Sequence, residues 1–220
     1  TVTEQATAPD ASTDCQGSAQ DDWAGLASAL IQSRFSVAPR LLQAPGPTPA
    51  ELQQMVEAAG TAPDHHDLRP WRLVRIADDQ RGTLSDLFEA CLREREPQPR
   101  ADHLARARAK AHHAPTLLLA IVRNEPADED VPPPERAATL GAAMMNLMLV
   151  AHAMGYGAML SGGRSLRSPR FARAFGLAPG EQPLCFVSIG TPQEIQRRPR
   201  PSAHELLTQW HPATGRNADP

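Results

Sequence analysis

Apolar residues recur at helical spacing in several parts of the chain, and the clearest helix start lies at Thr48. Thr48, Pro49 and Glu51 supply an N-cap, a first-turn proline and an acid at the third helical position. Apolar residues follow at helical spacing up to Gly60, so the pattern predicts a helix over 49–59. Weaker signals of the same kind predict helices over 23–32, from 83 to 92, from about 100 to 110, and over 169–175.

Other apolar stretches have the length of strands. The run TLLLAIV at 116–122 is almost wholly apolar, which is typical of a central strand covered on both faces. The segments WRLVRIA at 71–77, AMLS at 158–161 and LCFVSIG at 184–190 predict three further strands. No repeat or clear boundary divides these elements, so we expect one domain over 23–210.

The most apolar stretch of the chain runs from 136 to 154 and predicts a long helix. Thr139, Gly141, Asn146 and His152 interrupt it, and Ala and Met carry most of its hydrophobicity, which argues against a membrane span. A helix that is apolar on nearly all sides must be covered on nearly all sides. It therefore belongs at the centre of a domain or at a subunit interface, and a homodimer is the economical answer.

Three kinds of segment lack such a pattern. Residues 1–22 are polar, without the features of a signal peptide, and we expect them, like 211–220, to form a disordered tail. The acidic, proline-rich segment 124–134 is interpreted as a linker or a flexible lid. The segment 93–110 mixes basic and acidic residues, so an exposed loop and a surface helix are expected there rather than a phosphate-binding arm.

Composition narrows the class of protein. The 220 residues carry 22 Lys plus Arg against 25 Asp plus Glu, a formal charge of −3, which argues against nucleic-acid binding. The three cysteines are far apart and odd in number, so a disulfide framework is not indicated and a reducing compartment, the cytoplasm, is expected.

Common catalytic motifs are missing. Ser165 does not lie in a GxSxG elbow, and the single lysine, Lys110, lies in no phosphate-binding loop. The histidine pairs 65–66 and 112–113 lack the spacing that brings two ligands onto one helical face, so no metal site is expected.

The motifs that remain are RFSV at 34–37, APDHHDLRPW at 62–71, the apolar helix, AMLSGG at 158–163 and GTP at 190–192. In this order the chain resembles the FMN-dependent nitroreductase family, and within it the small bacterial YdjA-like branch, over about 30–210. The resemblance implies an α+β, three-layer fold with a mainly antiparallel central sheet flanked by helices. It also implies an intertwined homodimer that holds FMN at the shared interface.

The resemblance also suggests which residues hold the flavin. The arginine and serine of a family motif bind the FMN phosphate and map onto Arg34 and Ser36, with Phe35 between them. A guanidinium group and a hydroxyl suit a phosphate because both donate hydrogen bonds to its oxygens. Arg40, although two residues further on than the family spacing, stands for a later arginine near the pyrimidine side of the ring.

Two further stretches are implied in flavin binding. Many relatives carry a basic cluster before a proline near the C-terminus that reaches the phosphate; Arg198 and Arg200 are the candidates here, with Arg200 preferred. The backbone of the AMLSGG stretch lies along the flavin in this branch, which makes Met159, Leu160 and Ser161 cofactor contacts.

The loop after the second predicted helix is expected to reach the flavin of the partner subunit. His65 resembles the histidine with that role, and Thr61 and Asp67 are grouped with it. Most relatives have asparagine and glutamine where this chain has Asp67 and Arg69. A carboxylate only accepts and a guanidinium only donates, so this departure changes what the loop can offer a flavin edge.

The resulting hypothesis is an oxidoreductase in which NAD(P)H reduces FMN and leaves, after which a nitroaromatic or quinone-like acceptor takes the electrons. In this ping-pong scheme FMN does the chemistry, so no catalytic protein acid or base is expected. The alternative is a flavin-binding or redox-sensing protein with weak or no turnover, which the departures at Asp67 and Arg69 favour.

Overall fold

The computed structural model describes residues 14–195 and 197–211, which fold around one five-stranded sheet. The strand order is β1-β5-β3-β2, with β4 pairing to β5 as well, and every pairing between named strands is antiparallel. The strands are β1 (Leu42–Gln43), β2 (Trp71–Arg75), β3 (Thr116–Arg123), β4 (Gly157–Ser161) and β5 (Glu181–Pro192). The predicted central strand is therefore confirmed, since β3 lies between β2 and β5.

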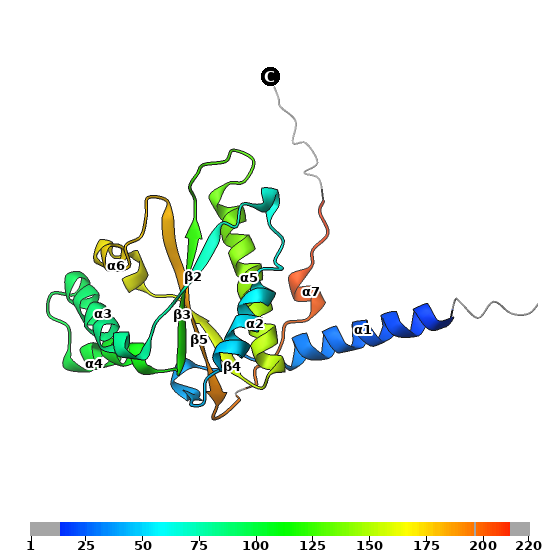
Figure 1. Cartoon of the computed structure of the whole chain (residues 1–220), viewed down its shortest axis with the longest axis horizontal. Coiled ribbons are helices and arrows are strands. Elements are labelled where there is room, and N and C mark those ends of the chain that lie inside the picture. The colour runs from blue at the N-terminus through cyan, green and yellow to red at the C-terminus, as the bar shows by residue number, and fades with distance from the viewer. Residues whose placement is uncertain (1–13, 196, 212–220) are drawn as a thin grey trace, which may run out of the picture.

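Helices cover both faces of this sheet, which gives three layers (Figure 1). One face carries α2 (Pro49–Ala59) and α5 (Pro133–Ala153). The other carries α3 (Arg81–Arg95), α4 (Ala101–Ala109) and α6 (Pro169–Ala174). Five short 3-10 helices connect these elements: η1 (Pro39–Leu41), η2 (His65–Asp67), η3 (Asp78–Gln80), η4 (Lys110–His112) and η5 (Arg164–Arg167). The expected α+β fold, mainly antiparallel and flanked by helices, is confirmed.

Alternate residues of β3 build the two halves of the core. Leu118, Ala120 and Val122 pack with α2 and α5, whereas Leu117, Leu119 and Ile121 pack with α3 and α6. Seven of the eight strand residues are buried, because neighbouring side chains point to opposite faces and both faces are covered. The apolar run that predicted the strand therefore divides evenly between two cores.

The capping signals at the start of α2 act as the sequence predicts. The Thr48 side chain accepts a hydrogen bond from the Glu51 backbone N–H, and the Glu51 carboxylate accepts one from the Thr48 backbone N–H. These reciprocal bonds satisfy two donors that a helix start leaves unpaired. The helix spans the predicted residues 49–59.

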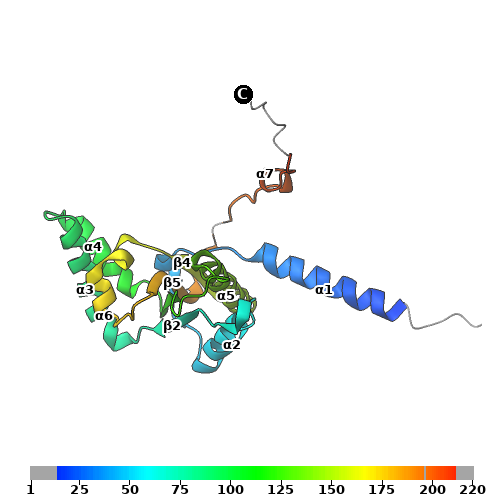
Figure 2. The same cartoon turned by 90° about the horizontal axis from the view of Figure 1, so that it is seen from above.

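The first helix differs from its prediction. It is expected over 23–32, but α1 runs from Asp14 to Ser33, through part of the stretch expected as a polar tail. Its apolar residues Trp23, Leu26 and Ile31 are exposed, and the helix projects from the body (Figure 2). Residues 1–13 and 212–220, also expected as tails, lie outside the described residues. The short helix α7 (Ala203–Leu206) projects as well.

The acidic loop before α5 is held by one buried arginine. Arg136 is 2% exposed and donates to the carbonyl oxygens of Val131, Arg123 and Pro126 at 3.0, 3.1 and 2.8 Å. All three bonds are charge-assisted, and they tie the segment 124–132 to the helix start. The loop is therefore fastened, which does not support its interpretation as a flexible lid.

Candidate functional site

The segment after α1 runs beside β4 and presents the side chains expected to hold a phosphate. Ser36 forms a parallel bridge with Ala158, and the Val37 backbone N–H donates to the Ala158 carbonyl oxygen at 3.2 Å. The Arg34 guanidinium lies close to Ser36, with 3.5 Å between its nitrogen and the serine Oγ. The strand thus fixes the position of Arg34 and Ser36.

Arg34 is left with donor capacity that the protein does not use. Its Nε is buried and has no hydrogen-bond partner among the described residues. Arg200 donates to the carbonyl oxygen of Arg34, and its guanidinium lies 4.6 Å from the centre of the Phe35 ring. Burial, together with the charge of Arg200, lowers the pKa of Arg34. Neither guanidinium has an ion-pair partner in the described part of the chain, and two like charges held together in this way suit an anion.

The second C-terminal candidate lies differently. Arg198 is exposed and has neither an ion-pair nor a hydrogen-bond partner within 14–195 and 197–211. Of the two arginines offered by the sequence, Arg200 is the one that the structure brings to Arg34 and Phe35.

A cavity of about 640 Å³ opens on the α3 and α4 side of the sheet. Its walls come from η1, α3, α4, η4, η5 and the facing surfaces of β4 and β5, with Phe88, Leu92 and Phe186 among its apolar residues. This volume and this mixture of apolar walls and polar groups are typical of small-molecule and cofactor sites. Arg40 and Ser161 line the cavity, as do Gly162 and Gly163.

The two other residues expected from the AMLSGG stretch lie in β4 without lining the cavity. Leu160 is half-buried, and its side chain packs against the core on the α5 face. Met159 pairs with Ser188, which does line the cavity. What β4 offers beside the cavity is therefore chiefly the end of the strand and the two glycines, where an added Cβ would meet nothing within 4 Å.

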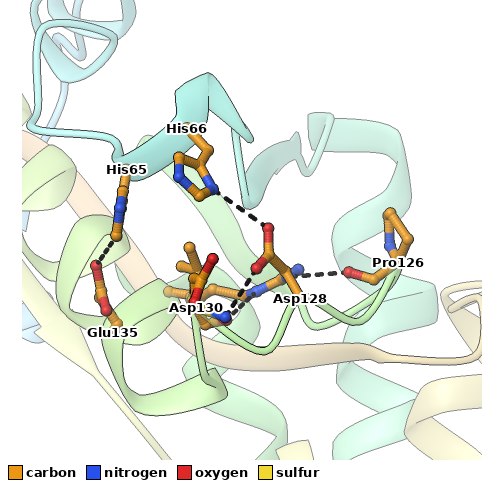
Figure 3. A network of polar contacts seen from close by, with 8 residues as sticks. His65, His66, Pro126, Asp128, Asp130 and Glu135 are labelled. Atoms are coloured by element: carbon orange, nitrogen blue, oxygen red, sulfur yellow. Dashed lines mark hydrogen bonds and ion pairs between the residues drawn. The ribbon is translucent and has the colours of Figure 1, made fainter.

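Thr61, His65 and Asp67 lie elsewhere, beyond the end of α2. The Thr61 hydroxyl accepts from the Asn146 side-chain amide at 3.2 Å, and none of the three residues lines the cavity. His65 Nδ1 lies 2.8 Å from a Glu135 carboxylate oxygen at the start of α5 (Figure 3). Within one chain, the predicted site residues therefore lie in separate places: around Arg34, along the cavity, and in this loop beyond α2.

The loop that carries His65 and Asp67 has an unusual backbone. His66, Asp67 and Arg69 have φ angles of 60°, 50° and 47°, in the left-handed region that L-residues rarely adopt. The Asp64 carboxylate accepts from the Arg69 backbone N–H at 2.7 Å, and His66 Nδ1 lies 3.5 Å from the Asp128 carboxylate (Figure 3). These contacts hold the loop in a strained shape.

Each of the two histidines in this loop contacts a single carboxylate. Among the described residues no group of three or more His, Cys, Asp or Glu side chains is placed to hold a metal ion.

None of the helices in the described part of the chain is long and apolar enough to cross a membrane.

Several residues that line the cavity were not predicted as site residues. Arg95, His103, Arg106 and Lys110 come from the stretch 93–110, for which the sequence predicts a solvated face. Helix α4 is indeed exposed along most of its length, but α3 and α4 fold so that one side of each borders the cavity. The available signal was the clustering of six cations in a stretch that includes the only lysine of the chain.

Comparison with known proteins agrees with this arrangement. Residues 31–191 match the family described as Nitroreductase. A protein of Escherichia coli (strain K12) named "Putative NAD(P)H nitroreductase YdjA" is 30% identical over 154 residues, which cover 69% of this chain and 81% of that protein. This chain belongs to the Nitroreductase family. The resemblance seen in the sequence is therefore confirmed.

Solved structures share the nitroreductase fold. A nitroreductase-like family protein from Bacillus cereus aligns with a TM-score of 0.70 at 22% identity, covering 83% of this chain and 95% of that one. A mutant form of the FMN- and NADPH-dependent nitroreductase NfnB, derived from sphigopyxis sp. strain HMH, aligns with a TM-score of 0.68 at 18% identity. That alignment covers 84% of this chain and 99% of NfnB. These likenesses support the three-layer fold of this nitroreductase family member.

Proposed function

We propose that this protein is an FMN-dependent oxidoreductase that passes electrons from NAD(P)H to nitroaromatic or quinone-like acceptors by a ping-pong mechanism. The observation that carries the proposal is the unpartnered, buried Nε of Arg34 beside Arg200, a short distance along the chain from the 640 Å³ cavity that Arg40 lines. Family membership and relatives named as NAD(P)H nitroreductases support the same reaction class.

The residues present fit the phosphate end of FMN. Arg34 and Arg200 would bind the phosphate through charge-assisted hydrogen bonds, and the Ser36 hydroxyl would donate a further one. A dianion placed there would relieve the repulsion between the two guanidinium groups. It would also give the buried Nε of Arg34 a hydrogen-bond acceptor, which this atom lacks among the described residues.

The cavity fits a flat ring, and it lies a few residues along the chain from the Arg34 segment. Arg40 lines it and has no ion-pair partner among the described residues, so its charge is available to the pyrimidine edge of a flavin. Gly162 and Gly163 leave the end of β4 open to close approach. Phe88, Leu92 and Phe186 supply apolar surface that limits the access of water.

FMN, when bound, supplies the two-electron chemistry. The overall reaction for a nitro group is R–NO₂ + NAD(P)H + H⁺ → R–NO + NAD(P)⁺ + H₂O, which balances two electrons. His113 also lines the cavity, but burial, with Lys110 and Arg40 nearby, lowers its pKa. It is therefore neutral at pH 7, and the proton of this reaction comes from solvent in our proposal.

A homodimer completes the proposal. Thr61, His65 and Asp67 do not line the cavity of their own chain, so they would serve the flavin of a second copy. Met145 and Val150 on α5 are only half-buried in one chain, and they would be covered at the interface. Sedimentation equilibrium is expected to give twice the mass of one chain, and a monomer with bound FMN would contradict this part.

Two free thiols support our proposal of a reducing compartment. Cys91 and Cys185 are both free and buried, and no disulfide joins the described cysteines. We place the protein in the cytoplasm on this basis.

The test begins with the purified protein, which should show the visible absorption of a flavin. Anaerobic addition of NADH or NADPH should bleach that band, and a quinone should restore it. Bound FMN that neither nicotinamide reduces would favour the alternative, a flavin-binding or redox-sensing protein. That alternative has one supporting observation: Asp67 and Arg69 lie 3.5 Å apart and face each other rather than the cavity.

A matched pair of variants tests the phosphate site. Arg200→Ala should weaken FMN retention by about 10- to 100-fold, because it removes a charge-assisted contact. Arg198→Ala removes the same charge two residues away, from a side chain without a partner in the described chain, and should leave FMN affinity within about twofold. Equal losses from both variants would show that only the general charge of the C-terminal segment matters.

A further inference from the structure

The walls of the cavity carry far more positive than negative charge. Five fixed cations line it, each from a different part of the wall: Arg40 in η1, Arg95 at the end of α3, Arg106 in α4, Lys110 in η4 and Arg164 in η5. Glu96 is the one carboxylate among the lining residues. The whole chain has a formal charge of −3, so this concentration is local and does not reflect the overall composition.

Most of these cations are not neutralised by the protein. Arg106 pairs with Asp102 at 2.6 Å, and a Glu96 carboxylate oxygen lies 3.5 Å from His103 Nδ1. Within the described part of the chain, Arg95, Lys110 and Arg164 have no ion-pair partner. A cavity with apolar walls and unpaired cations attracts anions more strongly than open surface does. Burial lowers the pKa of His113, which also lines the cavity, and the charges of Lys110 and Arg40 act in the same direction.

The proposed cofactor does not account for this charge. Arg34 and Arg200, which would hold the phosphate of FMN, do not line the cavity. The oxidised flavin ring is neutral, and Arg40 alone supplies the cation for its pyrimidine edge. Arg95, Lys110 and Arg164, together with the paired Arg106, are left for whatever binds beside the ring.

Resting on the proposed function, we propose that the physiological acceptor is an electron-poor aromatic compound that carries a carboxylate or sulfonate, and that Lys110 and Arg164 bind this anionic group. The two residues come from separate parts of the chain, η4 and η5, and both reach the same cavity. For 4-nitrobenzoate as probe, the reaction is ⁻OOC–C₆H₄–NO₂ + NAD(P)H + H⁺ → ⁻OOC–C₆H₄–NO + NAD(P)⁺ + H₂O. The carboxylate is unchanged, so its role is in binding.

The first experiment compares 4-nitrobenzoate with 4-nitrobenzamide, which has nearly the same shape without the charge. The ratio of their kcat/KM values is measured for the wild type, for Arg164→Gln, and for Arg167→Gln as the matched control. Arg167 lies in the same 3-10 helix and is exposed, but it does not line the cavity. Comparing this ratio between each variant and the wild type cancels the difference in reduction potential between the two acceptors, because that difference is the same for every protein.

We expect Arg164→Gln to lower the ratio by about fivefold, because one unit charge near the carboxylate is removed from a partly screened site. Lys110→Gln should act in the same direction. Arg167→Gln should leave the ratio unchanged within about 1.5-fold. The wild-type ratio should also fall as salt rises above about 0.15 M, where the screening length is about 8 Å. An unchanged ratio in Arg164→Gln and Lys110→Gln would overturn the proposal.

A second readout needs no turnover. Naphthalene-2-carboxylate and naphthalene-2-carboxamide are titrated into the oxidised holoenzyme, and binding is followed calorimetrically. The carboxylate should bind more tightly than the amide, and Arg164→Gln should remove most of that preference. Equal binding of the two compounds to the wild type would contradict the assignment of the cations to an anionic acceptor.

The phosphates of the donor are the other source of negative charge, and the kinetics separate the two. If Arg164→Gln raises the apparent Kd of NADH or NADPH in the anaerobic reductive half-reaction and leaves the acceptor ratio unchanged, the cations serve the donor and the proposal is wrong. If Arg164→Gln instead releases FMN, the residue belongs to the cofactor site, and the proposal is again wrong. A flavin that neither nicotinamide reduces refutes the proposed function alone, because the calorimetric titration still measures the preference for anions.

Discussion

The loop around Arg136 and the segment around Arg34 both withdraw an arginine from solvent, and they treat it in opposite ways. Every part of the Arg136 guanidinium reaches a backbone carbonyl, whereas the buried Nε of Arg34 reaches nothing within the described chain. The first arrangement fastens a loop. In the second, the buried Nε has no acceptor among the described residues, and Arg200 adds a like charge beside it. The contrast teaches that hydrogen-bond satisfaction, more than burial, separates a structural arginine from a ligand-binding one.

The largest expected effect on stability comes from replacing Arg136, the arginine whose guanidinium is fully hydrogen-bonded. Arg136→Met keeps an apolar stem but leaves the carbonyls of Val131, Arg123 and Pro126 without their donors, so it should lower the free energy of unfolding by about 3–5 kcal/mol. Urea titration followed by circular dichroism measures this. Arg136→Lys, which restores the charge and part of the bonding, should recover some of the loss. A loss below about 1 kcal/mol for Arg136→Met would erase the distinction between the two arginines.

Arg34→Ala should weaken cofactor binding and leave the stability of the fold almost unchanged. We expect it to weaken FMN binding by about 1.5–3 kcal/mol, or about 10- to 150-fold, because it removes a charge-assisted contact to the phosphate. The free energy of unfolding of the FMN-free protein should change little, since Arg34 has a poorly satisfied guanidinium and a repulsive neighbour in Arg200. Fluorescence titration of the FMN-free protein with FMN measures the affinity. Unchanged affinity would remove Arg34 from the site.

Arg72, whose guanidinium is hydrogen-bonded by a carboxylate, is expected to have an effect on stability between those of Arg136 and Arg34. Glu181 accepts from Arg72 at 2.6 and 2.8 Å and from Arg123 at 3.4 Å, and these contacts, the Arg72 bonds above all, lower the pKa of Glu181 from 4.5 to about 2. A depressed carboxyl pKa stabilises the fold above pH 4.5, and that stabilisation is lost as the pH falls towards 2. Glu181→Gln should therefore cost about 1.5–2 kcal/mol at about pH 7.

The pH dependence provides the control for Glu181. The difference in unfolding free energy between the wild type and Glu181→Gln should be constant above about pH 5 and should shrink between pH 4.5 and pH 2. Comparing two proteins at each pH removes the contribution of every other carboxylate. A difference that does not change over this range would show that the Arg72 pair adds nothing through charge.

The smallest effect is expected where an arginine is paired on the surface. Arg69 and Asp67 lie 3.5 Å apart, with side chains 81% and 79% exposed. Exposed pairs of this kind contribute little because water screens them and their side chains lose entropy. Asp67→Asn, which removes the charge but keeps a side chain that tolerates the left-handed φ of 50°, should change the free energy of unfolding by less than about 0.5 kcal/mol. A larger loss, measured by urea titration, would mean that the left-handed loop at 66–69 depends on this pair.

The sequence predicts best those elements whose signals are local. The helix at 49–59 is correct to the residue because Thr48, Pro49 and Glu51 form its start within four positions. The strand at 116–122 is correct to one residue because both of its faces are buried and its pattern is continuous. The long helix begins at Pro133 rather than at 136, because prolines are tolerated in the first turn of a helix, where the sequence predicts a loop.

The parts that the sequence could not predict depend on contacts between distant residues. Nothing near Arg136 in the sequence shows that its guanidinium reaches back to Arg123, and nothing in the stretch 93–110 shows that its cations border a cavity with Arg164. The two-residue strand β1 was missed for the same reason, because only its pairing with the end of β5 defines it. Conversely, a family motif allowed Arg34 and Ser36 to be predicted as site residues, although isolated residues of these types carry little information; the structure places them 3.5 Å apart.

The contact between Arg200 and the carbonyl oxygen of Arg34 joins positions 166 residues apart in the sequence. Any phosphate bound by both side chains would link the beginning of the folded domain to its end. Loading with cofactor would then raise thermal stability by mass action, by about 2.7 kcal/mol at about a hundred times the dissociation constant. Occupancy of the site and resistance of the C-terminal segment to proteases become one linked equilibrium.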